Sequence, residues 1–318
     1  MRPSAAMTAD GHQAWIQTQL SLIEAAIDEA LPKGELSRTK LFEALAYASL
    51  GGGKRIRALL CLATGQALAA DPAICMRAAV ALELIHAYSL VHDDLPCMDN
   101  DILRRGKPTV HVAYGEATAM LVGDGLQALA FEVLVGMSQL GLAADQCLEA
   151  IGALARASGP QGMVGGQAID LAVLGSAMSF VDLAQLQGMH EMKTGALLKA
   201  SVQLGLSCRG AVELHPAVDR LLNQYAAFLG LAFQVIDDVL DESASTEALG
   251  KTAGKDKAQQ KPTYVSLIGL EKARGFAHDL HRQSIDCLAQ AKKIDSGLGA
   301  EGMAHLAALA DLIVLRQH

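Results

Sequence analysis

The sequence predicts an all-α fold, with a single domain built around a central cavity. The 318-residue chain is 51% hydrophobic but only 4% aromatic, and this Ala- and Leu-rich composition suits close-packed helices better than sheets. Apolar residues recur at helical spacing, and we find neither alternating strands nor internal repeats. Two aspartate clusters lie 144 positions apart, counted from Asp93 to Asp237. If both serve one site, the chain cannot be two independent halves.

Glycine and proline breaks divide the N-terminal half into helices. Residues 1–11 are expected to be a flexible tail, and an Ile/Leu stripe predicts a first helix that ends at Pro32. Asp71 and Pro72 start a later helix that leads into the first aspartate cluster. The expected helices of this half are 38–50, one from about residue 54, 73–98, 114–140 and 143–158.

The C-terminal half contains the longest loop of the chain. Residues 243–262 are polar and rich in lysine, and a loop of this length suggests a lid over a site. Thr194 and Gly195 weaken a helix locally and can free carbonyl groups toward a cavity. The expected helices of this half are one beginning at 165, 178–205, 218–242, 263–293 and 300–317.

Composition excludes several classes of protein. The net charge of −8 argues against nucleic-acid binding, which needs a basic face. None of the six cysteines sits in a Cys-x-x-Cys pair, which favours reduced thiols in a cytoplasmic protein. The N-terminus has no apolar signal region, and no stretch reaches about 18 uninterrupted apolar residues, so we expect no membrane span.

The first cluster contains Asp93, Asp94, Asp99 and Asp101 and is followed by two arginines. Carboxylates gathered in this way repel one another unless a cation neutralises them, and their oxygens suit Mg²⁺. The adjacent arginines suit a multiply charged oxyanion, so the first hypothesis is a diphosphate held by Mg²⁺. Pro96 should kink the chain and return Asp99 toward Asp93. A helix end with solvated acids remains the simpler alternative.

The second cluster lies within one predicted helix. Gln234, Asp237, Asp238 and Asp241 occupy positions i, i+3, i+4 and i+7, so they share a helix face. The residues between them are apolar, which makes an ordinary solvated face a poor explanation. This pattern predicts a second group of metal-binding carboxylates.

Further polar residues suggest phosphate binding. Three glycines precede Lys54 and Arg57, and a helix that begins there could bind phosphate through its free N–H groups, although a flexible turn is the alternative. His92 precedes the first aspartates, as in some metal-dependent phosphohydrolases. A packed helix residue explains His92 better, because no matching upstream histidines occur.

Five motifs, taken in order, resemble those of the trans-isoprenyl diphosphate synthases, most closely the bacterial farnesyl diphosphate synthase (geranyltranstransferase) type. The match runs from about residue 40 to the C-terminus. The motifs are Gly-Gly-Lys-Arg-x-Arg (52–57), Asp-Asp-x-x-x-x-Asp (93–99) with Arg-Arg downstream, Gly-Gly-Gln-x-x-Asp (165–170), Lys-Thr-Gly (193–195) and Phe-Gln-x-x-Asp-Asp-x-x-Asp (233–241).

This resemblance implies an antiparallel helix bundle around a deep cavity, usually a homodimer, with three Mg²⁺ ions. It implies that isopentenyl diphosphate condenses with dimethylallyl or geranyl diphosphate. The implied Mg²⁺ ligands and their acidic neighbours are Asp93, Asp94, Asp99, Asp237, Asp238 and Asp241. The implied diphosphate-binding residues are Arg104, Lys193 and Lys251 for the allylic substrate, and Lys54, Arg57, His86 and Arg105 for isopentenyl diphosphate. Thr194 and Gln234 would face the allylic cation, with Gln167 and Asp170 in support.

Tyr88 is the expected determinant of product length. It lies five residues before Asp93, about 7.5 Å deeper along a helix, and its ring would stop the growing chain. An aromatic residue there resembles farnesyl (C15) synthases, although the neighbouring Ser89 is small and Tyr88 could also be ordinary core. Two positions depart from the family pattern, with Ala58 in place of a proline and Asn100 within the acidic run.

Three alternatives stand beside this hypothesis. A geranylgeranyl diphosphate synthase shares the chemistry and differs only in cavity depth. A class I terpene cyclase would have a degenerate second metal motif and would not need a second diphosphate pocket. A non-catalytic synthase subunit would have lost aspartates or arginines, and none is lost here.

Overall fold

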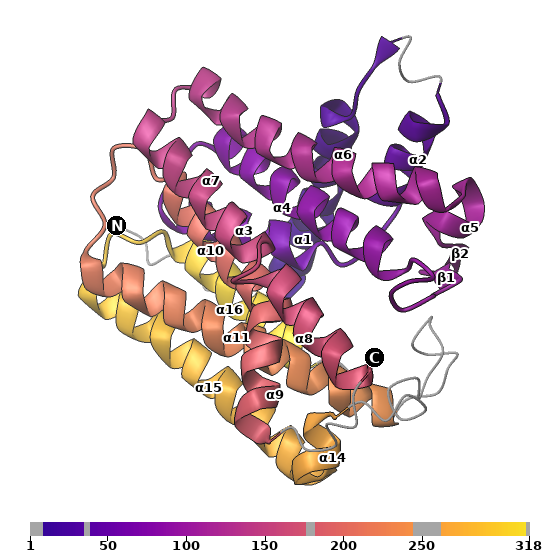
Figure 1. Cartoon of the computed structure of the whole chain (residues 1–318). Helices are drawn as coiled ribbons and strands as arrows, with labels where there is room; N and C mark the ends of the chain where they lie inside the picture. The colour runs from indigo at the N-terminus through magenta and orange to yellow at the C-terminus, as the bar shows by residue number, and fades with distance from the viewer. Residues whose placement is uncertain (1–8, 35–38, 176–181, 244–261, 316–318) are drawn as a thin grey trace.

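The computed structural model describes residues 9–34, 39–175, 182–243 and 262–315 (Figure 1). It confirms the all-α prediction for these ranges. The elements are α1 (Ala9–Ala30), α2 (Lys40–Ser49), α3 (Ile56–Ala67), α4 (Pro72–Asp93), β1 (Leu103–Arg104), β2 (Lys107–Pro108), α5 (Val110–Tyr114), α6 (Glu116–Val135), the 3₁₀-helix η2 (Gly136–Leu140), α7 (Ala144–Ser158), α8 (Met163–Gly175), α9 (Leu183–His190), the π-helix η3 (Glu191–Gly195), α10 (Ala196–Ser207), α11 (Pro216–Ser243), α14 (Tyr264–Ile268), α15 (Leu270–Ile294) and α16 (Ala300–Val314).

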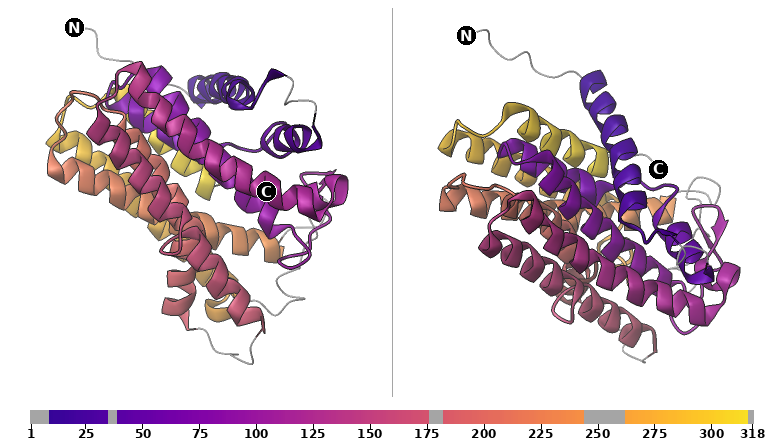
Figure 2. Two further views of the ribbon diagram at one scale, coloured as in Figure 1. Left: turned by 45° about the horizontal axis from the view of Figure 1, so that its top comes forward. Right: turned by 90° about the horizontal axis from the view of Figure 1, so that it is seen from above.

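The helices pack in successive layers around α3, α4 and α10. Helix α3 lies between α4 and α10, and α6 covers α4 on one side (Figures 1 and 2). On the other side, α11 packs along α10 and α15, and α16 packs on α3. The buried apolar side chains of these helices form one continuous cluster. One core therefore holds the two aspartate-bearing helices, α4 and α11, in fixed positions.

Helices α4 and α6 are both apolar enough, by length and composition alone, to cross a membrane. Helix α4 is capped by Asp71, whose carboxylate accepts hydrogen bonds from the N–H groups of Ala73 and Ile74. Its apolar window is 72% buried, as expected of a helix that is hydrophobic on every face and lies in a core. The window that spans α6 and η2 is only 44% buried, so this helix leaves an apolar face uncovered.

Several predicted boundaries were wrong. Residues 9–11 belong to α1 rather than to a tail, and α4 ends at Asp93 rather than at residue 98. A short antiparallel hairpin, in which Leu103 pairs with Pro108, follows the first acidic cluster. The helix expected over residues 263–293 is divided into α14 and α15. Gly269 lies between them with a φ of 86°, a conformation that favours glycine.

Candidate active site

The first aspartate cluster is gathered by a turn at the end of α4. As Pro96 predicted, the chain reverses, and the N–H of Asp99 donates to the carbonyl oxygen of Asp93 at 2.8 Å. The N–H of Asn100 donates to the carbonyl of Leu95 at 3.1 Å, and Asn100 has a φ of 52°. Asparagine tolerates this left-handed conformation better than most residues, which gives the departure at position 100 a backbone role.

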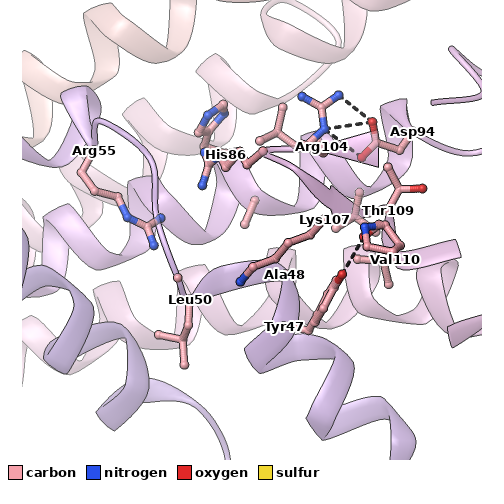
Figure 3. A pocket seen from close by; sticks show the side chains of 16 residues that line it. Tyr47, Ala48, Leu50, Arg55, His86, Asp94, Arg104, Lys107, Thr109 and Val110 are labelled. Atoms are coloured by element: carbon pink, nitrogen blue, oxygen red, sulfur yellow. Dashed lines mark hydrogen bonds and ion pairs between the residues drawn. The ribbon is translucent and has the colours of Figure 1, made fainter. Parts of the chain in front are cut away.

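Asp94 is buried and paired with Arg104. The Arg104 Nε atom lies 2.9 and 2.8 Å from the two carboxylate oxygens of Asp94, and its Nη2 atom lies 2.5 Å from Oδ1 (Figure 3). Asp94 is only 3% exposed. Burial raises the pKa of Asp94, and the arginine opposes this shift. This bidentate pair fixes the position of Arg104 beside the cluster.

Asp93 has a pKa well above the ordinary value of an aspartate. Burial raises the pKa of Asp93 to about 6, and Asp99 and Asp94 raise it further, whereas Lys193 and Arg104 lower it. A carboxyl group with this pKa is half-protonated near pH 6, and its charged form gains from a nearby cation. The effect of Lys193 also shows that the Lys-Thr-Gly motif lies close to the first cluster.

A hydrogen-bonded chain anchors the second cluster on α11. The Thr194 hydroxyl donates to Gln234 Oε1 at 3.1 Å, and Gln234 Nε2 donates to Asp238 Oδ1 at 2.9 Å. The other carboxylate oxygen of Asp238 accepts from the N–H of Tyr264 at 2.9 Å. Asp238 is 5% exposed and both of its oxygens are bonded to protein, whereas Asp237 and Asp241 lie on the same helix face and are less buried.

The Lys-Thr-Gly motif lies in a π-helix, η3, as the expected local weakening of the helix suggested. Lys193 Nζ lies 2.6 Å from Asp170 Oδ2, so the third and fourth motifs meet. Gly166 permits this contact, because a Cβ atom there would lie 2.2 Å from the backbone nitrogen of Lys193. The glycine therefore allows α8 to pack directly on the π-helix.

The glycine-rich loop before α3 is organised by Arg55, which was not predicted. Arg55 has a φ of 47° and is buried, and it forms ion pairs with Glu24 at 2.6 Å and Glu83 at 3.0 Å. Glu83 also accepts a hydrogen bond from the N–H of Ala58 at 3.2 Å. One N–H group at the helix N-terminus, that of Ala58, is thus bonded to a carboxylate of the protein.

The bond to Glu83 also gives a physical account of Ala58. Proline lacks an N–H group and could not donate to Glu83 at this position. Here the alanine N–H takes part in the buried network that holds the loop. The departure from the family pattern therefore adds a hydrogen bond.

Several cations surround His86 on one wall of the site. Burial lowers the pKa of Arg57, while Glu83 and Asp237 raise it and Arg105 lowers it. Burial, followed by Arg57 and Arg105, holds the pKa of His86 well below its usual range. Arg105 donates to the carbonyl of Gly52, and Lys54 lies exposed near it in sequence. A neutral histidine among arginines suits a site that receives an anion.

A cavity of about 430 Å³ extends inward from these groups. It lies along α4 and α8 and reaches the π-helix, so it brings together residues from four of the five motifs or from beside them. Its lining includes Arg57, His86, Tyr88, Ser89, Asp93, Gln167, Lys193 and Thr194. Tyr88 is 5% exposed and Met163 and Val164 close the apolar part of the wall. A smaller pocket beside it adds Lys107 and Tyr47 (Figure 3).

The carboxylates suit Mg²⁺ chemically. The half-buried carboxyl group of Asp93, whose pKa is about 6, and its neighbour Asp99 offer hard oxygen ligands whose charges need a cation. Within the described ranges, no three acidic, histidine or cysteine side chains already meet at one point. This arrangement fits an ion that takes one or two carboxylates from the protein and completes its coordination with phosphate oxygens and water.

Lys251 and the basic loop of residues 243–262 were predicted to contact the allylic diphosphate. Lys251 and almost all of that loop lie outside the described residues. Among the described residues, sequence reasoning missed Glu24, Arg55, Glu83 and Lys107. Lys107 follows the paired arginines closely, and Arg55 lies inside the Gly-Gly-Lys-Arg motif, which were the available signals.

Comparisons with known proteins show the family to which the chain belongs. The family model described as "Polyprenyl synthetase" matches residues 38–295. A probable farnesyl diphosphate synthase of Bradyrhizobium diazoefficiens is 49% identical over 277 residues, which cover 86% of this chain and 81% of the relative. The large subunit 1 of a chloroplastic heterodimeric geranylgeranyl pyrophosphate synthase of Arabidopsis thaliana is 42% identical over 305 residues, which cover 96% and 79%.

Solved structures share the fold at full length. An FPP/GFPP synthase of Zymomonas mobilis in its apo form superposes with a TM-score of 0.82 at 41% identity, covering 96% of this chain and 100% of the other. A Helicobacter pylori geranyltransferase complexed with magnesium and isoprenyl diphosphate gives a TM-score of 0.82 at 31% identity, covering 99% and 100%.

Proposed function

Because this chain belongs to the polyprenyl synthetase family and elongates prenyl diphosphates, we propose that its product is (2E,6E)-farnesyl diphosphate. It would be made from isopentenyl diphosphate and dimethylallyl or geranyl diphosphate. The observation that carries the proposal is Tyr88, which lies in the wall of the cavity that extends inward from Asp93. The similarity to farnesyl diphosphate synthases supports the same product.

The proposal divides the cations around the cavity between two diphosphates. Lys193 and Arg104 lie beside the first aspartate cluster and would hold the allylic diphosphate, with Lys251 from the following loop. Arg57, His86 and Arg105, with Lys54, would hold isopentenyl diphosphate. Three Mg²⁺ ions, held by Asp93 and Asp99 and by Asp237 and its neighbours, would neutralise the departing diphosphate.

The protein then has two tasks in the reaction. It excludes water from the apolar cavity, and it orients the allylic C1 atom toward the double bond of isopentenyl diphosphate. The C1–O bond breaks with its electron pair leaving on diphosphate, and the new C–C bond forms from the double bond. Loss of a proton to the released diphosphate completes the step. Thr194 and Gln234 would position the reacting end from the π-helix side.

Product analysis is the direct test. The purified protein would be incubated with Mg²⁺, isopentenyl diphosphate and dimethylallyl diphosphate, and the dephosphorylated product identified by chromatography. We expect a C15 alcohol. A C20 product would instead identify a geranylgeranyl diphosphate synthase, the alternative that the Arabidopsis relative supports. Absence of condensation with either dimethylallyl or geranyl diphosphate would overturn the assignment and favour a cyclase or a silent subunit.

Tyr88→Ala tests the chain-length argument. Removing the buried ring deepens the cavity, so we expect products of C20 or longer to replace farnesyl diphosphate. Tyr88→Phe keeps the ring and is the matched control, with an unchanged product. A C15 product from Tyr88→Ala would refute Tyr88 as the chain-length determinant while leaving the reaction assigned.

We also propose that two copies of the chain associate through α6. Its large exposed side chains include Met120, Leu121 and Val135, which are 45%, 54% and 54% exposed, and Val112 and Leu140 are exposed on the neighbouring elements α5 and η2. Apolar area of this kind usually marks an interface. Sedimentation should give twice the chain mass of 33.3 kDa, and Leu121→Glu should give the monomer.

Finally, we propose that the enzyme works in the cytoplasm. All six cysteines are free, and five of them are buried in the reduced form. A reducing compartment maintains such thiols. Cell fractionation should recover the activity in the soluble cytoplasmic fraction, and recovery with membranes would contradict this proposal.

A further inference from the structure

Gln167 has an amide without a protein partner at the wall of the active-site cavity. The side chain is 8% exposed, and neither Oε1 nor Nε2 has a hydrogen-bond partner among the residues that the structure describes. Buried amides are nearly always bonded, because an unmet amide destabilises the folded state. Such a group points to an interaction that the bound substrate completes.

Other polar groups of the cavity wall are hydrogen-bonded to the protein or carry a positive charge, which would not stabilise a cation. The Ser89 hydroxyl donates to the backbone oxygen of His86, and His92 Nε2 bonds to the backbone oxygen of Met120. The Thr194 hydroxyl donates to Gln234 Oε1, which occupies the carbonyl dipole expected to face the allylic cation. Arg57 and Lys193 are cations and would repel positive charge.

Among the lining residues, Tyr88 and Gln167 are the neutral side chains with an uncommitted oxygen. Burial raises the pKa of Tyr88, so its hydroxyl stays neutral, and it belongs to the deep chain-length wall. Gln167 lies one helical turn, about 4.5 Å, from Asp170, which holds Lys193. On the opposite side along α8 are the apolar residues Met163 and Val164.

Gln167 therefore sits where the polar end of the cavity meets the apolar end. An allylic diphosphate with its phosphates at Lys193 and its hydrocarbon toward Val164 places C1 and C3 at this boundary. When the C1–O bond breaks, its electron pair leaves on diphosphate and the positive charge is shared by C1 and C3. A carbonyl dipole held there stabilises that charge without a covalent bond.

We propose that Gln167 is a catalytic residue whose side-chain carbonyl turns onto the allylic C1–C3 unit and stabilises the cation formed on ionisation. This inference rests on the proposed prenyl transfer and deepens it. Because the amide is unbonded in the free protein, its replacement should have opposite effects on stability and on rate.

The test compares Gln167→Met with Gln203→Met, two exchanges of an amide for a linear apolar side chain. Gln203 lies outside the cavity and donates to Asn223 at 2.9 Å. For Gln167→Met we expect kcat to fall about 100-fold, KM for both diphosphates to stay within about threefold, and the Tm of the free protein to rise by about 2 °C. For Gln203→Met we expect a lower Tm and an unchanged kcat.

Three results would overturn the inference. An unchanged kcat in Gln167→Met would remove the catalytic role. A raised KM with unchanged kcat would assign Gln167 to ground-state binding of diphosphate. A fall in Tm comparable to that of Gln203→Met would show that the amide is structural. Failure of the wild-type protein to form any prenyl product would instead reject the proposed function, so the two failures are distinguishable.

Discussion

The two aspartate clusters are built by different structural routes. The first is assembled after α4 ends, where a turn brings the backbone of Asp99 onto Asp93. The second lies within the continuous helix α11, where helical periodicity alone places Asp237, Asp238 and Asp241 on one face. The first cluster thus depends on a turn and its hydrogen bonds for its arrangement, whereas the second is arranged by the periodicity of one helix and then anchored by neighbouring elements.

The two clusters nevertheless share one feature: the two aspartates of each Asp-Asp pair differ in burial and bonding. In each Asp-Asp pair, the second acid is buried and bonded to protein, Asp94 to Arg104 and Asp238 to Gln234 and Tyr264. The first acid, Asp93 or Asp237, is less buried. This difference separates the acids expected to bind Mg²⁺, Asp93 and Asp237, from the acids that hold each cluster in place. The two kinds are adjacent in the sequence and identical in residue type.

The largest expected effects are losses of activity when the first aspartate of each pair is replaced. Asp93→Asn and Asp237→Asn each remove a proposed Mg²⁺ ligand and should lower kcat by about 1,000-fold or more, since charge stabilisation of the leaving group is the main catalytic contribution. Both variants should keep the wild-type Tm to within about 2 °C. Steady-state kinetics over a range of Mg²⁺ concentrations measures the first effect. Full activity in either variant would contradict the assignment of the first aspartates as Mg²⁺ ligands.

The second acids should show their effect in the stability of the free protein. Asp94→Asn leaves Arg104 without its bidentate partner and should lower the free energy of unfolding by about 2–3 kcal/mol. Asp238→Asn places an amide N–H against one of its two donors, Gln234 Nε2 or the N–H of Tyr264. It should lower the free energy of unfolding by about 1–2 kcal/mol. Urea unfolding measures both values.

Asp101→Asn is the matched control for Asp94→Asn. Its carboxylate is 33% exposed and lies 3.9 Å from Arg104, so its removal should change the stability by less than about 0.5 kcal/mol. If Asp94→Asn were equally mild while abolishing Mg²⁺-dependent activity, Asp94 would be a metal ligand rather than an anchor.

This comparison also shows which parts of the site a sequence can predict. The spacing of Gln234 to Asp241 predicted the shared helix face, because helical periodicity is local. Pro96 likewise predicted the turn that returns Asp99. The anchoring of Asp94 by Arg104 and of Asp238 by the N–H of Tyr264 was not predictable, because these partners come from the hairpin and from α14. Only tertiary packing brings these elements together.

The same limit applies to the cationic wall. The Gly-Gly-Lys-Arg-x-Arg motif indicated phosphate binding, but nothing local distinguishes Arg57, which lines the cavity, from Arg55, which is turned inward. The distinction depends on Glu24 and Glu83, which lie on two other helices. The all-α class followed from composition and periodicity, whereas the hairpin was too short to leave a pattern.

The smallest expected effect is a pH dependence confined to the first cluster. The pKa of Asp93 is raised from 3.8 to about 6, so the folded protein binds a proton more tightly than the unfolded chain. The resulting stabilisation is complete at low pH and is lost as the pH rises through about 6. Between pH 5 and 7, without Mg²⁺, wild-type protein should lose about 1 kcal/mol more than Asp93→Asn in urea unfolding. Asp237→Asn should follow the wild type, and an equal pH dependence in Asp93→Asn would show that Asp93 is not the titrating group.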